Sequence, residues 1–237
     1  MSKLRAVAPR TEKDIHELRA LVLTMAGYVE ESVDTSMKAL VLRDKSLLLQ
    51  ILKIELEVNR LHKKIDGVCF RILACQSPVA SYLRLVFAII KINVDLERMG
   101  DLVRNNSYAI EEYLQSSPNL AVQQIREMAS TVTRMIRDGF DAFMENDLER
   151  AQKVLAVDES VDRFRNRLSE ELREHLQQPV GDFQSTMALL SVVRNLERLA
   201  DHATNIAEEV IFYLTGSDVR HSRSVVGDDR LKTEEEV

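Results

Sequence analysis

Apolar residues recur every three or four positions through most of this chain, which is the spacing that places them on one face of an α-helix. The pattern is clearest in two long segments. The apolar positions are Leu85, Ile89, Ile92, Leu96, Met99, Val103 and Ile110 in one segment, and Leu189, Val192, Leu196, Leu199, Ala203, Ile206 and Val210 in the other. Each set predicts an amphipathic helix whose apolar seam packs against neighbouring helices.

Turn-forming residues divide the helical pattern into six segments. The expected helices run over about 12–43, 46–74, 78–114, 120–145, 148–176 and 182–216. Pro78 suits the first turn of the third helix, and Asp182 suits the N-cap of the sixth. With no segment of strand-like alternation between these helices, the sequence predicts an all-α fold.

The third and sixth segments share a ten-residue pattern. Residues 96–105 and 196–205 keep Leu, Glu, Arg, Asp and Asn at the same spacing, and other pairs such as Asp44 and Asp147 match at a nearby offset. Such self-similarity indicates duplication of a structural unit. We therefore expect two tandem three-helix bundles, over residues 12–115 and 119–216. The remaining tail, 217–237, is too polar to bury an apolar face and is expected to be disordered.

Composition agrees with this fold and narrows the function. The 237 residues are 45% hydrophobic, with only 7 Gly and 4 Pro, which favours long helices. A net charge of -6 argues against a nucleic-acid-binding protein. The sequence contains neither a membrane-spanning apolar run nor a signal peptide, so a cytoplasmic location is expected. Cys69 and Cys75 lie in an apolar helical stretch and are expected to be buried, reduced core residues.

The repeated pattern also carries a stripe of possible metal ligands. The six positions of the stripe are Glu97, Asp101 and Asn105 in the first copy and Glu197, Asp201 and Asn205 in the second. Successive members lie about 6 Å apart along a helix axis and fall away from the apolar seam, so they are expected to face outward.

Acidic residues on the second helix of each unit could complete the metal shell. The candidates are Glu55 and Asn59 in the first unit and Asp158 and Asp162 in the second. Ligation by oxygen alone suits Mg²⁺ or Mn²⁺ and could accept Fe. No His recurs with the stripe, which disfavours a zinc site of the His and Cys type. The identity of the metal (Mg, Mn, Fe or Zn) stays open.

The stripe also has a purely structural interpretation. Glu97 can pair with Arg98 or Arg104, and long helices need a solvated face. Retention of the same polar residues in both copies favours a functional role. The sequence has no Gly-rich phosphate loop, nucleophile elbow or helical H-E-x-x-H motif, so we expect no catalysis. A metal-dependent carboxylate-bundle enzyme and a purely structural bundle remain as alternatives.

The duplicated motif resembles that of the PhoU family. Residues 195–208 are similar to the family signature, residues 95–101 are similar to its first copy, and the resemblance covers roughly 12–215. It implies a cytoplasmic protein, commonly a homodimer, that negatively regulates phosphate uptake and the phosphate-starvation response. The implied partners are the ATPase subunit of the phosphate ABC transporter and the membrane sensor histidine kinase. The protein would reach the membrane only through these partners.

The resemblance also implies metal binding at the repeated motifs. Carried onto this sequence, the ligands are Glu97, Asp101, Glu197 and Asp201, with Asn105 and Asn205 as weaker candidates. One departure concerns residues 104–107, Arg-Asn-Asn-Ser, where the family more often has a small apolar run such as Asn-Ile-Ala. This departure makes metal binding less certain in the first unit than in the second.

Overall fold

The computed structural model describes residues 9–75, 80–115, 121–176 and 182–219, and these residues form six helices. The helices are α1 (Pro9–Leu42), α2 (Ser46–Cys75), α3 (Ala80–Tyr113), α4 (Val122–Glu145), α5 (Leu148–Leu176) and α6 (Phe183–Thr215). The prediction of an all-α fold is confirmed, and the bounds of α5 are those expected. Pro78 and most of the polar tail, residues 220–237, lie outside the described residues.

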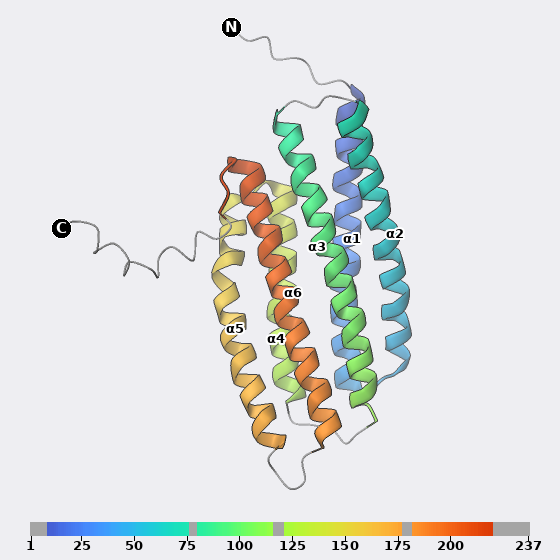
Figure 1. The fold of residues 1–237 in the computed structure, drawn as a ribbon, viewed down its shortest axis with the longest axis vertical. Coiled ribbons are helices and arrows are strands. Elements are labelled where there is room, and N and C mark those ends of the chain that lie inside the picture. The colour runs from blue at the N-terminus through green and yellow to red at the C-terminus, as the bar shows by residue number, and fades with distance from the viewer. Residues whose placement is uncertain (1–8, 76–79, 116–120, 177–181, 220–237) are drawn as a thin grey trace, which may run out of the picture.

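The six helices are arranged with four in the middle and one at each side (Figure 1). α1, α3, α4 and α6 form the middle group, in which α1 packs against α3 and α4, and α6 also packs against α3 and α4. α2 covers the first unit by packing on α1 and α3, and α5 covers the second by packing on α4 and α6. Each unit is therefore a three-helix bundle, and the two bundles share a broad central contact.

Both predicted seams lie in the core. No residue of either seam is more than 3% exposed, which confirms the prediction from the heptad-like spacing. The buried apolar residues of the two units belong to one continuous cluster. Because this core runs through both units, the division into domains at 12–115 and 119–216 stays a prediction.

The central contact between α3 and α6 contains buried and partly buried polar groups as well as apolar side chains. Asn195 on α6 donates a hydrogen bond from Nδ2 to Oδ1 of Asn106 on α3, over 2.9 Å, and both residues are buried. Lys91 on α3 reaches Glu209 on α6, with 2.9 Å between Nζ and Oε1. Polar groups withdrawn from water are costly unless they are paired, so these contacts fix which residues of the two antiparallel helices lie opposite each other.

Local chemistry explains where the helices end. The carboxylate of Asp182 accepts hydrogen bonds from the backbone N–H groups of Gln184 and Ser185, as expected for an N-cap. At the other end of α6, Gly216 adopts a φ of 77°, a left-handed conformation that glycine tolerates best. None of the helices, over the residues described, is both long and apolar enough to cross a bilayer.

The two cysteines differ in their surroundings. Cys69 is 1% exposed, and its burial and the nearby charge of Asp66 raise the pKa of its thiol to about 12. Cys75 is exposed, so the prediction that both cysteines are buried is wrong for this residue. The reason is its position as the last residue of α2, where the preceding Ala74 is exposed too.

Candidate functional site

The predicted carboxylates of the first unit lie along the contact between α2 and α3. We call Glu55 and Asn59 of α2, with Glu97 and Asp101 of α3, the first acidic patch. The side chains of Glu97 and Asp101 are each 26% exposed, so they are half-buried against neighbouring side chains. They face outward only in part, because α2 covers the side of α3 on which they stand.

Arg104 binds two members of the first acidic patch at once. Its Nη1 atom lies 2.8 Å from Oε1 of Glu55, and its Nη2 atom lies 3.1 Å from Oδ1 of Asp101. Glu55 is only 8% exposed, and Asn59 donates a second hydrogen bond to the same Oε1 atom, over 2.6 Å. A carboxylate this buried needs cationic or donor partners. Arg104 and Asn59 supply them from the protein itself.

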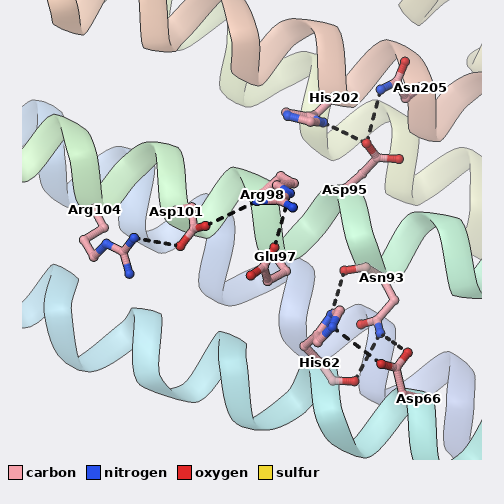
Figure 2. Close-up of polar contacts among 10 residues, drawn as sticks. All are labelled: His62, Asp66, Asn93, Asp95, Glu97, Arg98, Asp101, Arg104, His202 and Asn205. Carbon is pink, nitrogen blue, oxygen red and sulfur yellow. Dashed lines mark hydrogen bonds and ion pairs between the residues drawn. The ribbon is translucent and has the colours of Figure 1, made fainter.

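Arg98 lies near the exposed side of the same patch. Its guanidinium is 3.7 Å from Glu97 and 3.9 Å from Asp101, and its side chain is 61% exposed (Figure 2). Exposed ion pairs at such distances contribute little to stability. The sequence suggested that Glu97 could pair with Arg98 or Arg104. In the structure Glu97 pairs with Arg98, while Arg104 binds Asp101 and Glu55 instead.

A second polar contact holds α2 against α3 close to the patch. The Nδ2 atom of Asn93, a fully buried residue of α3, donates to the backbone oxygen of His62 and to Oδ1 of Asp66 (Figure 2). The donor–acceptor distances are 3.1 and 2.9 Å. These hydrogen bonds fix the register of the two helices that carry the first acidic patch.

The predicted asparagines of the stripe do not join the carboxylates. Asn105 and Asn205 are both exposed, and Asn205 donates a hydrogen bond to Asp95 on α3, over 3.2 Å (Figure 2). Asp95 also lies 2.7 Å from Nδ1 of His202. Asp95 thus connects α3 to α6, a role that the sequence did not suggest. Whether the two asparagines bind a metal stays a prediction.

The second unit has a matching patch with different contents. We call Asp158 and Asp162 of α5, with Glu197 and Asp201 of α6, the second acidic patch. Oγ1 of Thr204 donates to Asp158 over 3.1 Å, and Arg165 lies 3.2 Å from Glu197. All four members of this patch are carboxylates, whereas the first patch has three and an amide.

Burial and the negative charge around Asp201 change the pKa of its carboxyl group. Its pKa is raised to about 6, first by desolvation and then by the charges of Glu197, Asp158 and Asp162, while His202 acts in the opposite direction. In the part of the chain that is described, no hydrogen bond or ion pair joins the Asp201 side chain to another residue. Placing a cation near Asp201 would relieve this repulsion, which makes the charge of the second patch suitable for a metal.

The ligand atoms of the two patches do not already form a metal coordination shell in the described residues. Within the described ranges, no three side chains of the His, Cys, Asp and Glu types converge closely enough to hold a metal ion. The oxygen donors of the second patch fit hard cations such as Mg²⁺ or Mn²⁺ in their chemistry. Side-chain rearrangement would be needed to bring them into one coordination shell.

A basic groove adjoins the second acidic patch. It lies between α5 and α6, encloses about 630 Å³ and is lined by four arginines, Arg165, Arg173, Arg194 and Arg198. Apolar side chains such as Met187 and Leu190 form the rest of its walls, and Glu197 belongs to both the groove and the patch. A groove of this composition suits a ligand or partner surface that carries acidic groups next to apolar ones.

Comparison with known proteins agrees with the duplicated architecture. The PhoU domain family matches residues 22–110 and again residues 125–210. A phosphate-specific transport system accessory protein PhoU homolog of Pseudomonas putida is 34% identical over 219 residues, which span 91% of this chain and 84% of that protein. The accessory protein PhoU of Escherichia coli K12 is 30% identical, over 92% of this chain and 89% of that protein.

Solved structures show the same fold. The crystal structure of PhoU from Pseudomonas aeruginosa aligns with a TM-score of 0.83 at 32% identity, and covers 87% of this chain and 99% of that one. The phosphate transport system regulatory protein PhoU from Streptococcus pneumoniae aligns with a TM-score of 0.81 at 29% identity, over 88% and 99%. With both units matched by the family and the whole fold shared with its solved members, this chain belongs to the PhoU family.

Proposed function

We propose that this protein is a cytoplasmic negative regulator of phosphate uptake and of phosphate-starvation signalling. It acts as a homodimeric, non-catalytic adaptor between the ATPase subunit of the phosphate ABC transporter and the sensor histidine kinase. The observation that carries this proposal is the match of both three-helix units to the PhoU domain. The relatives are named as accessory or regulatory proteins of phosphate transport, which supports the assignment to that system.

The basic groove supports an adaptor role in physical terms. Its arginines present planar donor groups that bind carboxylates in a bidentate manner. Arg194 and Arg198 are both exposed at the groove, so they are accessible to a second protein. In this proposal the groove receives an acidic surface of the transporter ATPase.

Metal binding at the second acidic patch forms the second part of the proposal. A divalent cation among the carboxylates of the second patch would reduce the negative charge beside the groove, because Glu197 belongs to both. The groove would then attract acidic groups more strongly. The bound metal would raise the affinity for the partner, and the bound partner would raise the affinity for the metal. Removing the metal would therefore weaken docking.

A pull-down tests the adaptor role. The tagged chain is incubated with the transporter ATPase and with the kinase, at high and low phosphate, with Mn²⁺ or with EDTA. We expect capture of both partners, dependence of capture on phosphate, and loss of ATPase capture by the double variant Arg194→Glu/Arg198→Glu. The matched control is Arg60→Glu/Lys63→Glu, which reverses two exposed charges on α2, away from the groove.

The outcomes separate the parts of the proposal. Failure of the wild-type chain to capture either partner, together with unchanged transporter control in a deletion strain, would contradict the adaptor role. Equal capture by the groove variant and its control would contradict the docking surface alone. For the metal, elemental analysis of Glu197→Gln/Asp201→Asn should show loss of bound Mn²⁺ with helicity retained. Full retention of Mn²⁺ would refute the second patch as the site.

A further inference from the structure

The two units place different side chains at the same position beside their acidic patches. Residues of α3 and α6 correspond at a spacing of 100 positions, so Arg104 in the first unit matches Thr204 in the second. Both side chains reach across to the preceding long helix of their own unit. Arg104 contacts Glu55, and Thr204 contacts Asp158, and these two acidic residues correspond in the duplication.

The difference between the two side chains is a full positive charge. The guanidinium of Arg104 spans the first patch from Glu55 to Asp101, with contacts of 2.8 and 3.1 Å. The hydroxyl of Thr204 is neutral and makes one hydrogen bond, of 3.1 Å, to Asp158. The first patch is thus neutralised in part by Arg104, whereas the equivalent position beside the second patch holds an uncharged hydroxyl.

A bound metal and Arg104 would compete for the same oxygen atoms. The guanidinium donates a hydrogen bond to the Oε1 atom of Glu55 and forms an ion pair with the Oδ1 atom of Asp101, and its side chain is only 33% exposed. A divalent cation placed among these oxygens would lie next to a fixed positive charge at a site with limited access to water. Two positive charges at so short a distance repel each other strongly when solvent screening is reduced.

We infer that Arg104 is a built-in counter-ion that takes the place of a metal in the first unit. The first acidic patch is therefore stable without metal, and the metal capacity of the protein resides in the second patch alone. This inference deepens the proposed function, on which its statement about the second patch rests. It assigns the two repeated motifs to different tasks, one structural and one responsive to cations.

Exchange of the two residues tests the inference. The full chain carrying Arg104→Thr, stripped with EDTA, should unfold about 4–8 °C lower than the wild type, because Glu55 and Asp101 lose their cation. Adding Mn²⁺ should restore most of this difference and add bound Mn²⁺ beyond the wild-type content. The reciprocal variant Thr204→Arg should lose Mn²⁺ from the second patch. Arg104→Lys keeps the charge, so Mn²⁺ should stabilise this variant no more than it stabilises the wild type.

The readouts distinguish this inference from the metal part of the proposed function. If neither the wild type nor Glu197→Gln/Asp201→Asn binds Mn²⁺, the proposed metal site fails, while a rescue of Arg104→Thr by Mn²⁺ still supports the counter-ion. If Mn²⁺ gives Arg104→Thr no more stabilisation than wild type, the inference is overturned. It is also overturned if Glu97→Gln/Asp101→Asn removes Mn²⁺ from the wild-type chain, a measurement that remains valid should Arg104→Thr fail to fold.

Discussion

The Nδ1 atom of His202 on α6 lies 2.7 Å from Oδ1 of Asp95 on α3, and fewer than one fifth of each side chain is exposed. Asn205 donates to the same carboxylate oxygen. This contact joins the two units at their central helices. It also adjoins Asp201, so the link between the units and the second acidic patch occupy neighbouring turns of α6.

Replacing Asp95 with alanine should weaken the central contact. The change leaves the mostly buried His202 ring without its acceptor and also removes a hydrogen bond from the exposed Asn205 amide, at a cost of about 1–3 kcal/mol. Urea unfolding at pH 7 measures the difference. The control is Glu159→Ala, which removes an ion pair whose side chains are 79% and 66% exposed and should cost less than about 0.5 kcal/mol. Equal effects of the two variants would contradict a structural role for Asp95.

Replacing Asp201 with asparagine should change stability in a pH-dependent way. The folded protein holds the Asp201 proton up to a pKa of about 6, whereas an unperturbed aspartate loses it near 3.8. As the pH rises, the Asp201 carboxyl therefore loses its proton at a lower pH in the unfolded chain than in the folded protein. The ionised aspartate thus lowers the stability of the fold as the pH rises from about 4 through about 6.

The variant Asp201→Asn removes this charge, so it should be more stable than wild type at pH 7.5 and equal to it at pH 4. Because the residue is exposed, solvent screening makes the gain a fraction of what the pKa alone suggests. Urea titrations in EDTA at both pH values measure it. The matched variant Asp101→Asn should instead be destabilised at pH 7.5, since it removes a partner of Arg104. The opposite order would contradict our account of the two patches.

Substitution by alanine should change the stability of the protein by different amounts at two helical glycines. A Cβ atom at Gly67 of α2 would meet nothing within 4 Å, so Gly67→Ala should stabilise the protein by about 0.5–1 kcal/mol through helix propensity. At Gly100, within the repeated motif, the added Cβ would lie 3.1 Å from Cγ1 of Val58. Gly100→Ala should therefore gain about 1 kcal/mol less than Gly67→Ala in thermal unfolding. Equal gains would show that Val58 moves aside without cost.

The two thiols should react at very different rates. Cys75 is exposed, while Cys69 is buried and its pKa is raised to about 12. Because the thiolate is the reactive form, a disulfide reagent such as DTNB at pH 8 should titrate one thiol per native chain and two per unfolded chain. The variant Cys75→Ser should give no rapid reaction in the native state. Rapid modification of that variant would mean that α2 opens around Cys69.

The helices were predictable because their signals are local. Apolar spacing places Leu96 and Leu196 in the core wherever the neighbouring helices lie, and the Asp182 carboxylate caps α6 through backbone groups two and three residues away. The exposure of Cys75 was not predictable in this way. It depends on which neighbouring residues pack against the last turn of α2, which no periodicity within α2 reports.

The candidate site was predicted only in part. Glu97 and Asp101 lie on α3, Glu197 and Asp201 lie on α6, and Asp158 and Asp162 of α5 lie near Asp201. The contact of Arg104 with Glu55 depends on how α2 and α3 pack, because the two residues are 49 positions apart in sequence. The link from Asp95 to His202 crosses between the units. Spacing within one helix carries no information on either contact.

The antiparallel pairing of α3 with α6 resembles the interface of a symmetric dimer, in which one surface meets a second copy of itself. In a true homodimer, any substitution would appear on both sides at once. Joining the two units in a single polypeptide removes that constraint, so position 104 can hold an arginine while the equivalent position 204 holds a threonine. A covalently joined pair of units can therefore carry two different surfaces at equivalent positions while the fold keeps its twofold plan.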